Sequence, residues 1–158
     1  MSGGTPATAR LDQAKVAYAL HPYAHDARAE SYGDEAAAAL GVDPRRIFKT
    51  LIVTVDAKLA CAVVPVAGML NLKAFAAALG GKRAELADPA KAQRATGYVL
   101  GGISPLGHKT RIPVVIDESA LAFESVFVSA GKRGLQVELA PAELVSLTAA
   151  RTASIATT

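Results

Sequence analysis

The chain has 158 residues, of which 51% are hydrophobic and 20% are charged, and its net charge is +3. This length and composition suit one globular domain with a sizeable core, and no repeat or low-complexity segment divides it. The longest nearly apolar run, residues 59–70, is too short to cross a bilayer, residues 1–10 lack the apolar region of a signal peptide, and the lone Cys61 excludes an internal disulfide. We therefore expect a cytoplasmic protein, and the small basic excess favours an anionic partner.

Capping residues, periodicity and turn signals predict a series of short elements along the chain. They are a helix over 5–15, a strand over 16–23, a helix over 33–40, strands over 47–56 and 59–66, helices over 71–79 and 88–96, strands over 98–100, 114–117, 125–129 and 135–139, and a helix from Pro141. The tail, residues 151–158, is small and polar and is expected to fray. Strands at hairpin spacing between short helices, without strict alternation of strand and helix, indicate an α+β protein rather than a doubly wound parallel sheet.

The segment 96–107 follows an expected helix and is rich in glycine. Gly101 and Gly102 lack Cβ, so they can adopt positive φ and let another molecule approach the backbone. Pro105 biases Ser104 towards an extended conformation. Such a loop can point several N–H groups and a hydroxyl at an anion or an ester oxygen. A plain turn between two strands fits the same residues, and the loop alone does not decide between these two interpretations.

Lys49 lies on the same face of the expected 47–56 strand as the apolar Leu51, Val53 and Val55. A lysine at this position either keeps an exposed strand edge from pairing with another chain or is held in a site. In a site, its partly desolvated ammonium would bind a phosphate or a carbonyl oxygen more strongly than in water.

Residues 129–134 form a second glycine-rich segment, in which a serine ends a strand and Lys132 and Arg133 follow Gly131. Its hydroxyl, its N–H groups and its two cations could hold a phosphate, and a basic hairpin turn fits equally well. Further basic residues fall in expected loops at 45–46, 82–83, 109 and 111. If these groups share one face of the protein, they would follow a phosphate backbone.

Two familiar kinds of site are disfavoured. A P-loop needs a lysine directly after its second glycine, whereas His108 follows Gly107, and no helix is expected next. His21, His25 and Asp26 could be imagined as metal ligands, but three groups on a strand end and a loop, without a second cluster, make a weak site. We therefore predict neither an NTPase nor a metal centre.

Seven segments together form one recognisable pattern. They are Leu20-His21-Pro22-Tyr23-Ala24-His25-Asp26, Gly33-Asp34-Glu35, Phe48-Lys49-Thr50-Leu51, Ala87-Asp88-Pro89, Thr96-Gly97-Tyr98, residues 101–107 and residues 129–134. In order and spacing they resemble the bacterial YbaK/EbsC family of free-standing aminoacyl-tRNA editing domains, most closely its Cys-tRNA(Pro) deacylase branch. The resemblance covers the chain from Thr5 to about Leu147. One departure is Ala130, where the family usually has a second glycine beside Ser129, and its methyl is expected to narrow the pocket or restrict φ.

The resemblance implies a six-stranded mixed β-barrel-like core with peripheral helices, in a single editing domain over residues 1–158 with its core at about 5–149. It implies removal of cysteine from mischarged Cys-tRNA(Pro), with Cys-tRNA(Cys) as a second candidate substrate, and neither a metal nor an organic cofactor. The implied partners are the mischarged tRNA and, in a ternary complex, prolyl-tRNA synthetase. Nothing in the sequence demands more than a monomer.

By the same resemblance, Lys49, Gly101, Gly102 and Ser129 become the candidate catalytic residues. The candidate substrate-binding residues are Tyr23, Ile103, Ser104, Pro105, Gly131, Lys132 and Arg133. Loop N–H groups near residues 101–103 could stabilise an oxyanion, and Lys49 could hold the terminal adenosine phosphate or the carbonyl. No strong nucleophile is visible, which agrees with the route that the family suggests, in which the cysteinyl thiol attacks its own carbonyl and leaves as a cyclic thiolactone. Attack by water is the alternative.

Two other functions stay open. A related editing domain for alanine or serine would need a positioned water, because its substrate has no thiol. A non-catalytic module that binds tRNA or a synthetase would bind without turnover, and replacement of Lys49 would have little effect.

Overall fold

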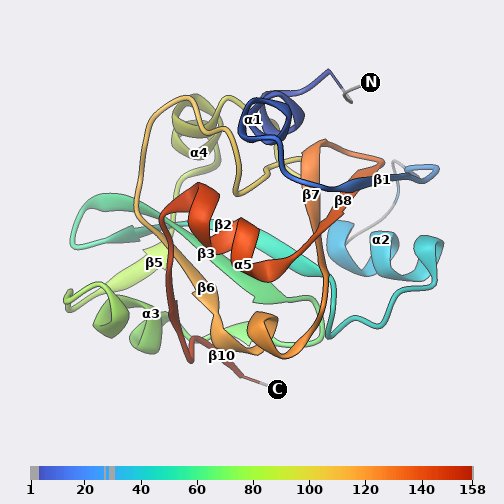
Figure 1. Cartoon of the computed structure of the whole chain (residues 1–158). Helices are drawn as coiled ribbons and strands as arrows, with labels where there is room; N and C mark the ends of the chain where they lie inside the picture. The colour runs from blue at the N-terminus through green and yellow to red at the C-terminus, as the bar shows by residue number, and fades with distance from the viewer. Residues whose placement is uncertain (1–3, 27, 29–30, 158) are drawn as a thin grey trace.

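The computed structural model describes residues 4–26, 28 and 31–157 (Figure 1). Its helices are α1 (Pro6–Ala14), α2 (Tyr32–Leu40), α3 (Leu72–Ala78), α4 (Pro89–Thr96) and α5 (Pro141–Thr148), with a 3-10 helix η1 at Glu118–Ala122. The expected caps are present: the side chains of Thr5, Asn71 and Asp88 accept N–H groups in the first turns of α1, α3 and α4. Gly41 ends α2 with a φ of 65°. All five predicted helices are confirmed within a residue or two of their predicted bounds.

The strands of the described residues form three sheets. The five-stranded sheet has the order β5-β2-β3-β6-β9, with β5 (Ala84–Leu86), β2 (Phe48–Val55), β3 (Lys58–Pro65), β6 (Val114–Asp117) and β9 (Arg151–Ala153). The three-stranded sheet contains β1 (Ala19–Pro22), β8 (Leu135–Leu139) and β7 (Val126–Lys132). The remaining pair is β10 (Ala156–Thr157) with β4 (Met69–Leu70). Because β6 pairs in parallel with both β3 and β9 while the other pairs are antiparallel, the α+β class with mixed pairing is confirmed.

The predicted barrel-like closure is wrong, since no sheet of the described residues closes on itself. An isolated parallel bridge between Ile47 and Phe127 joins the start of β2 to β7, and the Phe127 N–H donates to the Arg46 carbonyl at 3.0 Å. The two strands do not pair beyond this bridge. Lys49 and Ser129, farther along each strand, instead line the cavity described below. A cavity therefore lies where continuous hydrogen bonding between β2 and β7 would close the barrel.

The β2–β3 hairpin is confirmed along its whole length, from the Phe48–Pro65 pair to the Val55–Lys58 pair. Asp56 and Ala57 make the two-residue turn with φ values of 48° and 71°, the left-handed geometry that matches the twist of a hairpin. The Asp56 carboxylate accepts the N–H groups of Lys82 and Arg83 at 3.0 and 2.9 Å. These bonds lower the pKa of Asp56 and fix the turn against the start of β5.

Two predictions are wrong, a strand over 98–100 and a frayed tail, and the short strands β4 and β5 were not predicted. Residues 98–100 are not a strand, because Tyr98 turns its ring into the core and its hydroxyl donates to the Leu106 carbonyl at 2.6 Å. The tail does not fray: it forms β9 and β10, and Ile155 between them is fully buried. The carboxylate of Asp117 accepts the N–H groups of Ile155 and Ala156 at 3.0 Å each, which anchors the tail below the sheet.

The core lies on both faces of the five-stranded sheet, with α1 and α4 above it and α3 below it in Figure 1. Neighbouring residues Ile52 and Val53 belong to opposite clusters, as the alternation of a strand requires. Phe75 of α3 fills the lower cluster. Cys61 is fully buried in the upper cluster, where desolvation raises its thiol pKa, so its role is structural. In the described part of the chain, no helix is long and apolar enough to span a membrane.

Candidate active site

A cavity of about 340 Å³ opens beside the first half of β2. On this side of β2, β5 pairs only with residues 53–55, so residues 48–51 have no neighbouring strand there. Five segments contribute the walls: the start of α2, the first half of β2, the loop after α4, β7 and β8. The lining residues are 31–33, 47–51, Leu100, Gly101, Ile103, Ser129 and Gln136. This size is typical of small-molecule sites.

Lys49 is half-buried in this lining and is the one charged residue among its described members. Its ammonium makes no hydrogen bond or ion pair with any residue that the structure describes. Lys49 lies on an unpaired strand edge, as expected for a residue that prevents pairing with another chain. It also lines the cavity beside that edge, as expected for a residue held in a site. An ammonium with free donors in a mostly apolar cavity attracts an anionic or carbonyl oxygen strongly.

The loop after α4 is held in place by its own hydrogen bonds. Gly97 ends α4 with a φ of 81°, the Gly102 N–H donates to the Val99 carbonyl at 2.9 Å, and the Ser104 Oγ accepts the Leu106 N–H at 3.2 Å. Gly101 has a φ of 83°, and a Cβ on it would lie 2.8 Å from the Tyr32 ring. Glycine is therefore required at 101 both by the backbone geometry and by the close approach of α2.

Gly101 and Ile103 line the cavity, and the described residues leave their backbone donors unused. Neither N–H has a hydrogen-bond acceptor among the described residues, whereas the N–H of Gly102 between them is used inside the turn. Free donors on a rigid loop at the wall of an apolar cavity are what an oxyanion site requires.

Ser129 and Ala130 are neighbours on β7 and face opposite sides. Ser129 lines the cavity, and its Oγ accepts the Gly131 N–H at 3.2 Å, which leaves the hydroxyl proton free to donate to a ligand. Ala130 is fully buried in the core, where its carbonyl accepts the Thr5 hydroxyl at 2.5 Å. The expectation that Ala130 narrows the pocket or restricts φ is wrong, because its methyl points into the core and its φ is not positive.

The segment 129–134 is a basic hairpin rather than a free loop. β7 continues to Lys132 through an irregularity in register, and Arg133 and Gly134 make the turn into β8. The Arg133 guanidinium lies 5.0 Å from the centre of the Tyr32 ring, and its Nε donates to the Leu100 carbonyl at 2.7 Å. Arg133 thereby links α2, the loop after α4 and the hairpin at the rim of the cavity.

Of the residues predicted from the sequence, the lining contains Lys49, Gly101, Ile103 and Ser129. Gly102 packs against the backbone of Lys132, where a Cβ would lie 2.8 Å from that Cα. The remaining predicted residues are not part of the lining, although Arg133 contacts Tyr32 and Leu100, which are. Tyr23 donates its N–H to Gly134, Ser104 is fully buried, Pro105 lines a different cavity, and Gly131 packs against Tyr98 and Thr5.

Two further lining residues, which were not among the predicted site residues, carry polar atoms without a partner in the described part of the chain. The Thr50 Oγ1 and the Gln136 Oε1 are buried, and neither has a hydrogen-bond partner among the described residues. A buried polar atom without a partner costs about 1–3 kcal/mol, so its presence in a cavity wall points to a ligand that supplies the missing bond. The one sequence signal for Gln136 was an amide side chain between Leu135 and Val137 in a predicted strand, and only the structure shows that this side chain is buried.

The histidines considered as metal ligands have separate partners. The His21 Nε2 lies 3.0 Å from Glu138, and the His25 Nδ1 lies 2.8 Å from Glu35. The bond from His25 is the main reason that the pKa of Glu35 is lowered. Asp26 pairs with Arg28. Among the described residues, no group of three or more His, Cys, Asp or Glu side chains could hold a metal ion.

Comparison with known proteins gives a consistent result. Residues 27–147 match the family model described as an aminoacyl-tRNA editing domain. The chain is 40% identical, over 97% of its length and 93% of the relative, to the Enterococcus faecalis protein named "Putative Cys-tRNA(Pro)/Cys-tRNA(Cys) deacylase EbsC". It is 33% identical over 84% of its length to a proline–tRNA ligase of Shouchella clausii, of which it covers 25%. A crystal structure of "a putative trans-editing enzyme for prolyl tRNA synthetase" has the same fold, with a TM-score of 0.83 at 24% identity, covering 97% of this chain and 96% of that one.

Proposed function

The chain belongs to the aminoacyl-tRNA editing domain family, and on that premise we propose that it is a trans-editing deacylase that removes cysteine from mischarged Cys-tRNA(Pro), with Cys-tRNA(Cys) as a second substrate. The observation that carries the proposal is the unpartnered Lys49 ammonium in a cavity whose walls also present free N–H groups. Such a cavity can hold the ester of an aminoacylated adenosine and stabilise the charge that develops on its carbonyl oxygen.

Each group has a role that its position allows. The Gly101 and Ile103 N–H groups and the Ser129 hydroxyl donate to the carbonyl oxygen, and Lys49 binds that oxygen or the terminal phosphate. The side chains of Thr50 and Gln136 offer acceptors for the ammonium group of the amino acid. Tyr23, Ser104, Pro105 and Gly131 would act through the shape of the site, since they lie off the lining.

The lining supports a reaction without a protein nucleophile. Its hydroxyls belong to Ser31, Tyr32, Thr50 and Ser129, and among the described lining residues there is no His, Asp, Glu or Cys to activate them. The substrate's own thiol can supply the nucleophile: its sulfur forms a bond to the carbonyl carbon, the bond to the ribose oxygen breaks, and the proton of the thiol passes to that oxygen. Positioning can supply about 7–11 kcal/mol of the barrier in favourable cases.

The test is a set of single-turnover deacylation assays with purified protein on Cys-, Ala- and Ser-tRNA(Pro), and on Cys-tRNA(Pro) whose thiol has been methylated. We expect fast loss of cysteine alone, and none after methylation. Loss of alanine or serine at the same rate as cysteine would show that the chain is an editing domain for that amino acid. Retained loss after methylation would identify water as the nucleophile. Binding of tRNA without turnover on any substrate would leave a binding module and overturn the proposal.

The proposed assembly is a monomer that acts in the cytoplasm, on tRNA presented in a ternary complex with prolyl-tRNA synthetase. A small domain with a modest net charge of +3 would bind free tRNA weakly, so a synthetase that already holds the tRNA would raise its effective concentration. Addition of the synthetase should therefore lower the KM for Cys-tRNA(Pro) while the chemical step stays unchanged. An unchanged KM would show that the domain works alone.

A further inference from the structure

A second cavity, of about 370 Å³, lies between α1, residues 105–114 and the end of α5. It shares no residue with the first cavity. Its walls are partly apolar, from Pro105, Ile112 and Ala149, and partly basic, from Arg10 and Arg111. An apolar floor with convergent polar groups and this volume are typical of a small-molecule site.

The two arginines of this cavity have no counter-charge. Neither Arg10 nor Arg111 makes a hydrogen bond or an ion pair with a residue that the structure describes, and the cavity lining includes no Asp or Glu. The ion pairs of the described residues lie elsewhere and join His21 and Arg46 to Glu138, His25 to Glu35, Arg28 to Asp26, and Arg45 to Asp43. Because both side chains line the same cavity, an anion in it would meet two guanidinium groups that have no other partner among the described residues.

The third titratable group, His108, forms a fixed wall. Its Nε2 lies 2.7 Å from the Ser104 carbonyl oxygen, which can only accept, so this nitrogen carries a proton. Burial lowers the pKa of His108, so the ring is neutral at pH 7 and its Nδ1 is an acceptor. The positive charge of the cavity therefore belongs to the arginines, whose planar forks fit phosphate oxygens in pairs.

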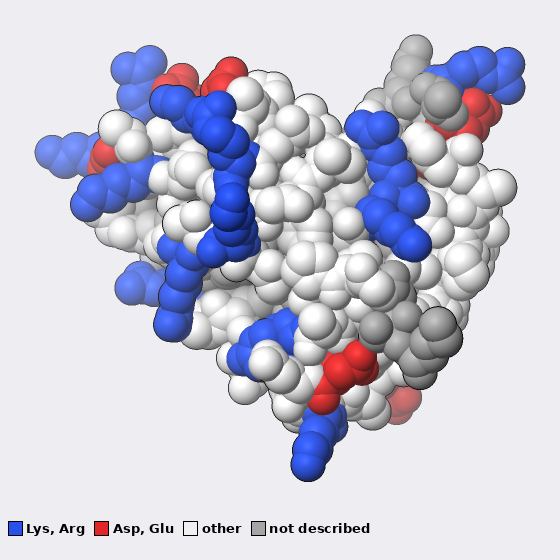
Figure 2. Space-filling view, turned by 90° about the horizontal axis from the view of Figure 1, so that it is seen from above, with Lys and Arg blue, Asp and Glu red and all other residues white. Residues whose placement is uncertain are grey.

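The surroundings of the cavity are also basic. Figure 2 looks down on the side of the molecule where α1 and α4 lie, and Lys and Arg side chains cross this face with few Asp or Glu between them. Lys91 and Arg94 of α4, and Lys109 beside the cavity, are exposed and make no ion pair with a described residue. The field over this face would draw a polyanion towards the cavity.

We propose that this second cavity binds the phosphate group of a nucleotide through Arg10 and Arg111, with the sugar or base against its apolar wall. The phosphate can belong to a nucleotide of the tRNA or to a free nucleotide. The first of these two alternatives rests on the proposed function. The geometry allows the first source, because Ile103 of the first cavity and Pro105 of the second are two residues apart, at most about 7 Å.

The direct test uses adenosine 5′-monophosphate as the probe and adenosine as its phosphate-free control, followed by amide chemical shifts in NMR. We expect the monophosphate, but not adenosine, to shift Gly107 and Ala149 beside the second cavity, and the double variant Arg10→Gln/Arg111→Gln to lose that response. Shifts confined to Ser129 and Gln136 would place the nucleotide in the first cavity and overturn the inference. No response at any amide would overturn it as well.

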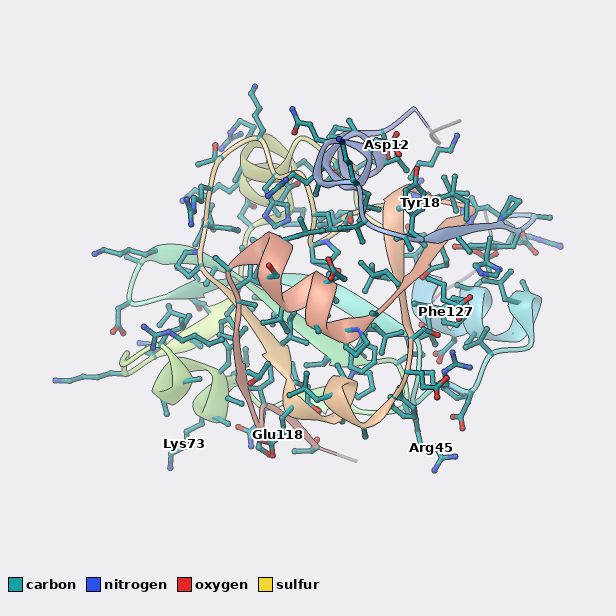
Figure 3. The ribbon with its side chains drawn as sticks, viewed as in Figure 1. Asp12, Tyr18, Arg45, Lys73, Glu118 and Phe127 are labelled. Carbon is teal, nitrogen blue, oxygen red and sulfur yellow. The ribbon has the colours of Figure 1, made fainter. Side chains whose placement is uncertain are left out.

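The matched control removes two cations from the opposite side. Figure 3 shows Arg45 and Lys73 at the lower edge, pointing away from the molecule, and Arg45→Gln/Lys73→Gln should bind the monophosphate like the wild type. A second variant, Arg10→Lys/Arg111→Lys, keeps both charges but loses the planar forks, so it should bind about tenfold more weakly. If Arg10→Gln/Arg111→Gln destabilises the protein, the Lys variant still tests whether the guanidinium groups bind the phosphate.

Deacylation kinetics distinguish a phosphate of the tRNA from that of a free nucleotide. If it belongs to tRNA, the Gln pair should raise the KM for Cys-tRNA(Pro) about tenfold or more at unchanged kcat. The slope of log affinity against log salt should then fall by about 1.4, for two single-strand contacts of about 0.7 each. An unchanged KM with lost monophosphate binding would identify a free nucleotide. Absence of any deacylation by the wild type would remove the proposed function without affecting the binding test.

Discussion

The two halves of β2 share one hairpin partner, β3, and differ in what lies along the opposite edge of the strand. From Val53 to Val55 the strand is flanked by β3 and β5 and packs against Phe75 of α3. From Phe48 to Leu51 it has β3 alone, and the first cavity lies on the open side. The missing neighbour therefore creates the site: one half of the strand contributes to stability, and the other half keeps polar groups free for a ligand.

The largest effect should come from the closed half. Phe75→Ala empties a fully buried position between α3 and β2, and should lower the free energy of unfolding by about 3–5 kcal/mol. Urea denaturation measures this loss, and Met69→Ala, at a position that is 71% exposed, should stay within about 0.5 kcal/mol of the wild type. The deacylation rate per folded molecule should be unchanged in both variants. A loss under about 1 kcal/mol for Phe75→Ala would show that this half is not the stabilising one.

The next effect separates a backbone requirement from a site requirement. Gly101→Ala and Gly41→Ala both put a Cβ on a residue with positive φ, which costs about 1–2 kcal/mol. Only at Gly101 does the Cβ also meet the Tyr32 ring and the Arg133 Nε, at 2.8 and 2.9 Å, whereas nothing lies within 4 Å at Gly41.

Gly101→Ala should therefore reduce kcat/KM about tenfold or more, and Gly41→Ala should leave it unchanged despite the loss of stability that its own positive φ causes. Equal activity in the two variants would mean that the loop after α4 does not shape the site.

A smaller effect distinguishes a polar group kept for a ligand from one kept for the fold. Thr50→Val removes a buried hydroxyl without a partner, so the free energy of unfolding should stay level or rise while the KM rises. Thr96→Val is the matched control, because the Thr96 hydroxyl donates to Ala92 and accepts the Tyr98 N–H, and its loss should cost about 1 kcal/mol. A destabilised Thr50→Val protein would contradict a ligand role for this hydroxyl.

The smallest effect is a pH dependence at the second cavity. Burial lowers the pKa of His108 in the folded protein below its ordinary 6.5. As the pH falls, His108 is therefore protonated at a higher pH in the unfolded chain than in the folded protein. The stability linked to His108 is therefore complete above pH 6.5 and is lost as the pH falls through its folded pKa. His108→Gln should lose less stability than the wild type between pH 7.5 and pH 5, as measured by urea denaturation. Parallel curves would contradict a neutral buried imidazole.

Local signals explain why the helices and the long strands could be predicted. Caps such as Thr5 and Asn71, the terminating Gly41, and the alternation of the hairpin strands act within a few residues, and tertiary contacts did not override them. Tyr98 and the tail failed for the opposite reason. The hydrogen bonds of Tyr98 to Leu106, and of Asp117 to Ile155, join residues whose pairing no local pattern contains.

The site divides in the same way. Lys49, Gly101, Ile103 and Ser129 were predicted because they lie in motifs, and the structure brings them to one cavity. Gln136 was missed because a single polar residue in a strand forms no recognisable motif. Its significance depends on the cavity, which exists because β5 does not extend beside the first half of β2. The second cavity was missed because Arg10 and Arg111 are about a hundred residues apart in the sequence.

The open half of β2 as the reaction site is the central claim, and a pair of lysines tests it most directly. Lys49 and Lys58 both belong to the β2–β3 hairpin, Lys49 at the open half of β2 and Lys58 beside the turn. In single-turnover deacylation of Cys-tRNA(Pro), with unfolding free energies measured in parallel, Lys49→Ala should reduce the rate at least about a hundredfold without loss of stability, and Lys58→Ala should match the wild type. Equal rates in all three proteins would contradict the claim and place the chemistry elsewhere.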